Sequence, residues 1–484
     1  MRLPPRPTVY EINTAVWLER LGCELGEVPA AEWEALAALP VDAVWLMGVW
    51  ERSPAGLAIA LTDPELEAGN RAALPDLGPE DVIGSPYCVR DYVVEERFGG
   101  RAALAAAREA LADRGLGLIL DYVPNHVAPD HPWTTSRPEC LLAGSEEDLA
   151  LQPEAFLRAP GGTFAKGRDP YFPPWPDVVQ LNAFSPALRE AVAETLAAIA
   201  EQCDGVRCDM AMLMTNEVFA RTWRDRAGPA PDTEYWPPLI AGVKDAFPGF
   251  VLIAEVYWDM EWTMQQQGFD YCYDKRLYDR LAHESAESVR GHLEADASYQ
   301  DSLIRFIENH DEPRAAATFG SAQARAAAVV MSTLQGARLY HDGQLEGRRT
   351  RIPVFLGRGP DEPADEDLRS FYSRLLRALA DSELRDGDWR LCECTGWPDN
   401  DSYRGLVSWC WSSGGSRNLV VVNLSDAAAQ AQVHLPWDDL TGRTWQLTDR
   451  LDGRRFERAG DALAAEGLYV GLDPWASHFL GFAA

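Results

Sequence analysis

Short apolar runs rich in β-forming residues alternate along this chain with alanine-rich segments of helical period. We predict strands at residues 9–13, 43–49, 116–123, 205–210, 250–256, 269–273, 303–309 and 337–341. This alternation is the pattern of successive βα units around a parallel sheet. It favours a (β/α)8 TIM barrel only modestly over a doubly wound sheet. The chain carries no Gly-rich dinucleotide fingerprint and no P-loop.

The segments between these runs have the spacing of amphipathic helices. We predict helices at residues 101–114, 186–202, 217–226, 237–247, 275–283, 322–334 and 367–380. Ser185 followed by Pro186 is a typical helix start, with a capping hydroxyl and proline at the first helical position.

The alternation breaks at two places, and 484 residues are too many for one simple core. Residues 127–182 are rich in proline, glycine and tryptophan and too long for an ordinary loop, so they predict a small inserted domain after the third barrel strand. Residues 386–484 contain short strands separated by turn residues and predict an antiparallel β-sandwich domain. The barrel would then comprise residues 1–126 and 183–385.

Charge and cysteine content narrow the range of partners and compartments. A formal net charge of −31 argues against nucleic acid and against an anionic membrane surface, and favours a neutral partner. No segment has the uncharged length needed to cross a bilayer, and the first residues lack the apolar run of a signal peptide. Nine scattered cysteines indicate reduced thiols and a cytoplasmic protein. The oligomeric state is left open.

Four segments end predicted strands with polar side chains. They are DYVPNH at 121–126, GVRCD at 205–209, LIAEV at 252–256 and FIENHD at 306–311. A parallel barrel builds its site from such strand ends, and paired carboxylates are the groups that break glycosidic bonds. In this order and spacing the segments resemble those of the α-amylase family of glycoside hydrolases. The resemblance extends over nearly the whole chain and implies a catalytic (β/α)8 barrel.

Arg207 and Asp209 lie two residues apart on one strand, so both face the same side while Cys208 packs on the other. The arginine would favour the ionised form of Asp209, as a carboxylate nucleophile requires. The family resemblance implies that Asp209 forms a covalent glycosyl-enzyme intermediate. Taken alone, the pentapeptide favours a structural ion pair, because such pairs are common.

Glu255 follows an apolar run, and apolar surroundings would keep it protonated as a general acid must be. The resemblance makes Glu255 the acid/base and Asp311 the third carboxylate, which holds sugar hydroxyls. Taken alone, Glu255 could be an ordinary strand terminus.

The resemblance also implies a set of substrate contacts. His126 would bind a sugar hydroxyl, and Asp121 would orient the cluster through Arg207. Tyr87 would stack on the sugar next to the scissile bond. His310 and Tyr257, which neighbour the carboxylates, are further substrate-binding candidates. A zinc site at His126 and His131 is disfavoured because their spacing of five, with a proline between, does not suit one helical face.

The chain departs from the family at several positions. Many starch-acting members carry a Lys-His pair after the nucleophile, where this chain has Met212 and Leu213. That histidine often helps to bind calcium, so we predict no required metal or organic cofactor, with calcium left as an alternative that would involve Asn125. Arg349 or Arg351 would reach a substrate hydroxyl or an anionic group.

The predicted function is that of a retaining glycosidase acting on α-linked glucosides or gluco-oligosaccharides through a covalent intermediate. Two alternatives remain. The first is an α-glucan transglycosylase or glucoside isomerase, in which a sugar hydroxyl or phosphate replaces water. The second is a non-catalytic glucan-binding protein, disfavoured because Asp209, Glu255 and Asp311 are all present.

Overall fold

The computed structural model describes residues 2–382 and 384–483. Eight strands form a closed barrel in the order β1-β14-β13-β12-β11-β10-β5-β2. Their bounds are β1 Thr8–Asn13, β2 Ala43–Met47, β5 Gly117–Tyr122, β10 Gly205–Cys208, β11 Val251–Ala254, β12 Tyr271–Tyr273, β13 Leu303–Arg305 and β14 Ala337–His341. The TIM-barrel prediction is confirmed.

The predicted strands are all present, but several end earlier than expected. β10 stops at Cys208 because Met210 adopts a left-handed conformation with φ 41°, which turns the chain out of the ladder. β13 stops at Arg305, and Asn309 then caps a turn by accepting the amide hydrogens of Asp311 and Glu312.

The predicted helices also form. They are α5 Gly100–Ala112, α8 Pro186–Ala200, α9 Asn216–Trp223, α10 Trp236–Ala246, α12 Lys275–His283, α16 Gly320–Thr333 and α17 Glu366–Ala380. The predicted cap is present, because the Ser185 side chain accepts the amide hydrogen of Leu188. α9 ends three residues earlier than predicted, since Arg224 has φ 49° and ψ −132° and cannot continue a helix.

Helices and strands that sequence periodicity did not predict complete the barrel portion of the chain. The helices are α1 Thr14–Leu21, α2 Ala30–Ala37, α3 Pro54–Ala60, α4 Pro64–Ala73, α11 Glu261–Gln266, α13 Ala286–Leu293, α14 Ala297–Asp301 and α15 Ala315–Thr318. The strands β3 Trp50–Arg52 and β4 Val89–Val94 pair antiparallel. These pieces are short, so their apolar spacing covers too few turns to stand out.

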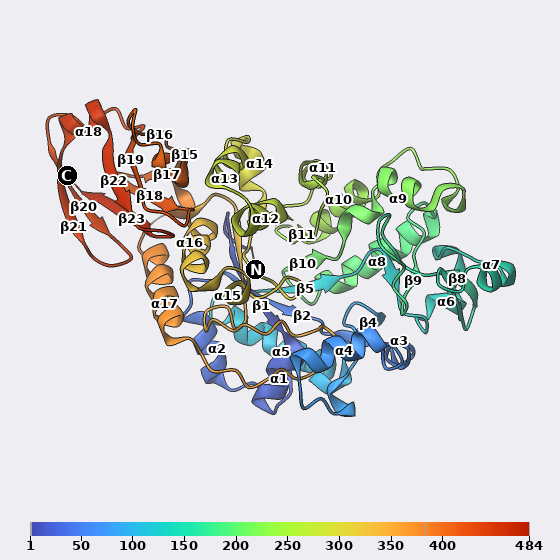
Figure 1. Cartoon of the computed structure of the whole chain (residues 1–484). Coiled ribbons are helices and arrows are strands. Elements are labelled where there is room, and N and C mark those ends of the chain that lie inside the picture. The colour runs from blue at the N-terminus through green and yellow to red at the C-terminus, as the bar shows by residue number, and fades with distance from the viewer. Residues whose placement is uncertain (1, 383, 484) are drawn as a thin grey trace. The chain divides into compact units, whose positions relative to one another are not determined.

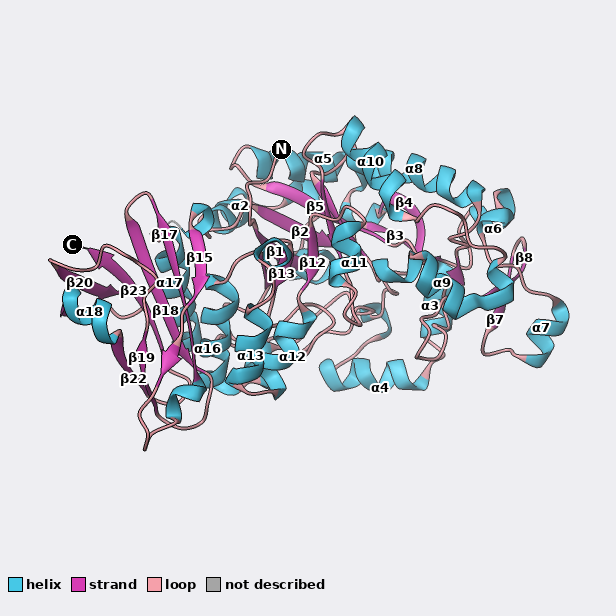
Figure 2. Ribbon diagram, turned by 90° about the horizontal axis from the view of Figure 1, so that it is seen from above, coloured by secondary structure: helices cyan, strands magenta, loops and turns pink. Residues whose placement is uncertain are grey.

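Residues between β5 and α8 form small elements of their own. The elements are β6 His126–Val127, α6 Trp133–Ser136, α7 Glu146–Leu151, β7 Phe156–Ala159, β8 Gly162–Ala165 and β9 Val179–Gln180. β7 and β8 make a hairpin (Figure 2). β6 pairs with β9. The limits of 127–182 as a domain stay a prediction.

The last hundred residues form two antiparallel sheets, as expected. One has the order β15-β17-β18-β23-β20-β21 and the other β16-β19-β22. The strands are β15 Asp388–Leu391, β16 Cys394–Thr395, β17 Leu406–Ser413, β18 Ser416–Asn423, β19 Ala429–Val433, β20 Thr444–Asp449, β21 Arg455–Ala459, β22 Leu468–Leu472 and β23 Ser477–Ala483. Both sheets contribute to one apolar core that includes Leu419, Val433 and Leu480, and the helix α18 Gly460–Glu466 adds Leu463.

The chain divides into two compact units. One comprises residues 1–4, 9–273 and 351–361, and the other residues 5–8, 274–350 and 362–484. In the second unit the indoles of Trp409 and Trp411 both donate hydrogen bonds to the carbonyl of Thr333, which joins the β-sandwich to the end of α16. Figure 1 shows α16 next to strand β18 of this unit. Among the described residues, no helix is both long and apolar enough to cross a membrane.

Candidate functional site

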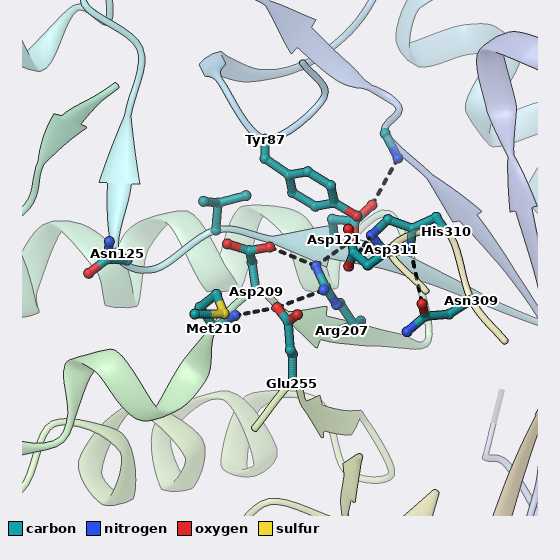
Figure 3. A network of polar contacts seen from close by, with 12 residues as sticks. Tyr87, Asp121, Asn125, Arg207, Asp209, Met210, Glu255, Asn309, His310 and Asp311 are labelled. Carbon is teal, nitrogen blue, oxygen red and sulfur yellow. Dashed lines mark hydrogen bonds and ion pairs between the residues drawn. The ribbon is translucent and has the colours of Figure 1, made fainter. Parts of the chain in front are cut away.

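Arg207 organises a group of carboxylates in the first unit. Its side chain is fully buried in β10. Nη1 donates to Asp209 Oδ1 at 2.9 Å, and Nη2 lies 2.7 Å from Glu255 Oε2 (Figure 3). Nη1 also lies 3.7 Å from Asp121 Oδ1. Three carboxylates from the ends of β5, β10 and β11 therefore share one guanidinium.

Strand register explains this gathering. Arg207 stands opposite Asp121 of β5 and Ile253 of β11. The ladder continues one step beyond β10 and β11, because the Glu255 amide donates to the Cys208 carbonyl at 3.0 Å. Asp209 and Glu255 therefore leave neighbouring strands at the same level.

Aromatic rings surround the guanidinium of Arg207. The ring centroids of Tyr87, Trp45 and Tyr273 lie 5.2, 5.4 and 5.7 Å from its central carbon. Burial by itself lowers the pKa of Arg207, but Glu255 and the other acidic groups around it outweigh burial and hold that pKa well above its usual value. The cluster therefore has a permanent positive charge at its centre.

Glu255 does not have the apolar surroundings that its sequence predicted. Besides Arg207, its Oε2 accepts the amide hydrogen of Met210 at 2.6 Å, and its Oε1 accepts the hydroxyl hydrogen of Tyr257 at 2.7 Å. The prediction was wrong because the apolar run before Glu255 packs within the barrel. Its polar partners are Arg207 of β10, Met210 of the loop after β10 and Tyr257 of the loop after β11. These donors fix the orientation of the carboxylate.

The loops after both strands carry unusual backbone conformations. Met210 follows Asp209 directly, and Trp258 and Asp259 follow Glu255 closely. These three residues have φ of 41°, 64° and 60°. Left-handed non-glycine residues cost energy and cluster where a fold must aim particular groups.

Asp121 and His126 are both buried side chains of the first unit. Asp121 is buried and accepts the amide hydrogen of Gly48 at 2.8 Å. Burial lowers the pKa of His126 to about 4, against a smaller opposite effect of its hydrogen bond to the Tyr87 backbone. The His126 ring is therefore neutral at pH 7, as a hydrogen-bonding partner for a neutral hydroxyl would be.

Two of the residues considered as metal ligands accept hydrogen bonds within the protein. Asn125 Oδ1 accepts a hydrogen bond from Gln180 at 2.9 Å, and Nδ1 of His131 accepts the amide hydrogen of Trp133 at 3.0 Å. Among the described residues, no group of three or more His, Cys, Asp or Glu could hold a metal ion.

Asp311 belongs to the second unit and follows the carboxyl end of β13. Its side chain is 41% exposed, and Oδ2 lies 2.9 Å from Nε2 of the buried His310. Asn309 shapes the turn through the Asp311 amide, as described above (Figure 3). The carboxylate of Asp311 is thus presented by a braced turn and reaches solvent.

A buried ion pair that sequence reasoning missed supports this turn. Glu308 accepts from Arg314 Nη1 at 2.6 Å and from the Ala315 amide at 2.8 Å. Burial raises the pKa of Glu308, but Arg314 and His341 outweigh it, so the pKa is lowered. The Glu in FIENHD was visible in the sequence, but its partners lie 6 and 33 residues away, and no local pattern marks them.

Comparison with known proteins bears on this arrangement. No protein-family model matches the chain. The α-amylase MalA of Haloarcula japonica is 27% identical over 365 residues, covering 73% of this chain and 45% of that protein. Alpha-amylase 3 of Dictyoglomus thermophilum is 22% identical over 305 residues, 59% of this chain and 58% of that protein. The chain thus spans about half the length of the curated relatives it matches.

Solved structures agree on the fold. A noncanonic maltogenic α-amylase from Thermotoga neapolitana matches with TM-score 0.68 and 18% identity, over 99% of both chains. An α-amylase from Geobacillus thermoleovorans, complexed with acarbose, matches with TM-score 0.68 and 16% identity over the full length of both chains. A trehalulose synthase variant matches with TM-score 0.68 and 16% identity, over 99% of both chains.

The chain is thus similar in sequence to α-amylases and has the fold of solved α-amylase structures. The expected departure from many starch-acting α-amylases lies in the turn after Asp209. Met212 and Leu213 lie in a 3-10 turn, Ala211–Met214, and both side chains are buried. They fill the interior beneath the turn. Arg349 is exposed, and its Nη1 donates to the Ala316 carbonyl at 2.6 Å, so the substrate contact expected of Arg349 or Arg351 stays a prediction.

Proposed function

We propose that the protein is a retaining glycoside hydrolase that acts on α-linked glucosides and gluco-oligosaccharides. The observation that carries this proposal is the contact of Arg207 with both Asp209 and Glu255 at adjacent strand ends. Two carboxylates held on one guanidinium support the close spacing of about 5–5.5 Å that a double displacement requires.

In the first step Asp209 attacks the anomeric carbon while Glu255 protonates the departing oxygen. Arg207 keeps Asp209 anionic. Three carboxylates around one guanidinium repel each other, which favours retention of one proton in the cluster. In the second step Glu255 takes a proton from water, which attacks the anomeric carbon and releases Asp209. Asp311, His126, His310, Asp121, Tyr87 and Tyr257 would bind the sugar or orient these groups, and no cofactor takes part.

The relatives and structural neighbours of the chain support this substrate class. Two curated relatives are α-amylases, and one structural neighbour was solved with acarbose.

We place the protein in the cytoplasm, because its nine cysteines are all free thiols.

A mechanism-based label tests the nucleophile. A 5-fluoro-α-glucosyl fluoride should add one sugar mass to the peptide that contains Asp209, and the first product of a maltooligosaccharide should be the α-anomer by NMR. Asp209→Asn should abolish both labelling and turnover, whereas Asp113→Asn, an exposed carboxylate at the end of α5, should change neither. A β-anomer as the first product, or a label on another residue, would contradict the mechanism.

Transglycosylation or isomerisation on the same site is the second candidate. The observation in its favour is the burial of apolar Met212 and Leu213 where many starch-acting members place a Lys-His pair. Incubation with maltose, maltooligosaccharides, isomaltose, trehalose and sucrose, with products separated over time, decides between the two. Longer or rearranged products would favour transfer over hydrolysis.

A further inference from the structure

A cavity lies in the first unit, between the segment after β8 and the end of α9. Its volume is about 670 Å³, within the range of small-ligand sites. Four arginines line it, Arg168, Arg221, Arg224 and Arg226. In a chain whose net charge is −31, such a concentration of positive charge at one cavity is unexpected.

Much of this positive charge has no acidic partner among the described residues, although Arg221 lies over the Tyr171 ring at 5.3 Å. Among the described residues, the guanidinium groups of Arg221 and Arg224 make no hydrogen bond or ion pair, and the buried Nε of Arg168 has no acceptor. Arg226 does have a partner, an ion pair with the Asp148 carboxylate. Arg221 and Arg224 are exposed to solvent, so their donors are free to meet an anion, whereas the buried Nε of Arg168 is costly to leave without an acceptor.

The acidic residues of the cavity do not cancel this charge. Asp169 is buried and uses Oδ1 to accept the amide hydrogens of Tyr171 and Phe172, at 2.6 and 2.9 Å. Asp225 is exposed. Burial and then repulsion from Arg224 and Arg226 lower the pKa of Arg168, so an anion bound there would relieve that repulsion.

The arginines are held by the fold. Arg168 stacks on Trp223 with 4.6 Å between its guanidinium carbon and the ring centroid, and its Nη2 donates to the Thr222 carbonyl at 2.9 Å. Arg224 occupies a left-handed conformation at the residue that ends α9, with φ 49°. Strain of this kind persists where surrounding structure fixes it, and it cuts the helix short beside the cavity.

Aromatic residues connect this cavity to the catalytic candidates. Tyr171 and Phe172 are 58% and 68% exposed and offer rings on which a sugar could stack. The Tyr171 ring lies 4.8 Å from the ring of Trp258, which follows Glu255 by three residues. A ligand that extended from the cavity along these rings would approach the Glu255 loop.

We propose that this arginine-lined cavity binds the phosphate group of a phosphorylated gluco-oligosaccharide. A phosphate dianion offers several acceptor oxygens to several guanidinium groups, and arginine suits this contact by its forked geometry. The inference rests on the proposed glucan chemistry of the Asp209–Glu255 site, and it adds an anionic substrate class to it.

Binding tests the proposal without turnover. Calorimetry with the full-length Asp209→Asn protein at low salt should show maltose 1-phosphate or maltose 6′-phosphate bound at least about tenfold more tightly than maltose. In that background, Arg221→Gln with Arg224→Gln should remove this preference. Arg71→Gln with Arg101→Gln, which removes two exposed surface arginines of the same unit, should leave it intact. High salt should reduce the preference, because phosphate recognition is electrostatic.

Three results would overturn the proposal. These are equal affinities for both phosphosugars and maltose, a preference that survives the double substitution in the cavity, and phosphosugars bound no more tightly than inorganic phosphate. Turnover of neutral maltooligosaccharides by the unsubstituted protein tests the proposed function separately. Failure of that turnover with an intact phosphosugar preference would overturn the glycosidase assignment and leave the phosphate site standing.

Discussion

Arg207 places its Nη2 atom 2.7 Å from the carboxylate of Glu255, a residue 48 positions later in the chain. The same guanidinium donates to Asp209, so one buried cation holds the two carboxylates proposed for catalysis. The contact between Arg207 and Glu255 depends on the side-by-side position of β10 and β11, as does the hydrogen bond from the Met210 amide to Glu255.

Arg207→Lys should therefore lower kcat by about 100-fold or more, even though it keeps the positive charge. An ammonium group is a point charge, whereas the two terminal nitrogens of a guanidinium contact two carboxylates at once. Steady-state kinetics on a chromogenic maltoside measures the effect. Arg207→Gln, which removes the positive charge, shows how much of the effect is due to charge. We expect Arg207→Gln to lower the melting temperature further, because it leaves buried carboxylates without a cation. Full activity in the lysine variant would contradict this role of the two guanidinium nitrogens.

Tyr257→Phe should shift the alkaline limb of the pH profile of kcat/KM to higher pH. The Tyr257 hydroxyl donates to Glu255 Oε1 and thereby favours the ionised carboxylate, so its loss favours the protonated form that acts as acid. The profile recorded with a chromogenic substrate measures the shift. Tyr469→Phe, at an exposed tyrosine of the β-sandwich, is the matched control and should leave the profile unchanged. An alkaline limb that moved to lower pH would count against Glu255 as the proton donor.

His126 should make the protein less stable as the pH falls from about 6.5 towards 4. Its pKa is about 4 in the folded state, below the ordinary value of 6.5, so the unfolded chain binds the proton more readily in that window. Titration of this histidine therefore lowers the free energy of unfolding by about 2 kcal/mol between pH 7 and pH 5. Urea unfolding at the two pH values measures the difference.

The His126→Gln variant is the test of that assignment. It should lose less stability between pH 7 and pH 5 than the unsubstituted protein. His131, whose pKa burial also lowers to about 4, should contribute in the same direction, so the double variant with His131→Gln should have the smallest change. An unchanged difference in the double variant would show that other groups cause the acid sensitivity.

Glu308→Gln should destabilise the protein by about 3–5 kcal/mol, because it leaves the buried guanidinium of Arg314 without its carboxylate. Chemical denaturation measures the loss. Glu366→Gln removes a carboxylate from an exposed ion pair with Arg369 and should cost less than about 1 kcal/mol. Similar losses in the two variants would argue that the Glu308 ion pair does not support the turn before Asp311.

Sequence patterns predicted much of the fold because the βα repeat is a local signal. The strand Ala337–His341 and the helix Lys275–His283 have the predicted bounds. The shared face of Arg207 and Asp209 also followed from the two-residue period of a strand. The surroundings of Glu255 could not be predicted in this way, because two of its partners, Arg207 and Met210, belong to the segment of β10 and the loop after it.

The sequence by itself determined the order of strands and helices and the resemblance to α-amylases, since hydrophobic period and residue spacing are properties of short stretches. It also determined which carboxylates stand at strand ends. Only the tertiary structure decided how Asp121, Asp209 and Glu255 share Arg207, how Glu308 finds Arg314 and His341, and how arginines from two segments line one cavity. These contacts join residues through packing and register, and neither is encoded in the spacing of a single segment.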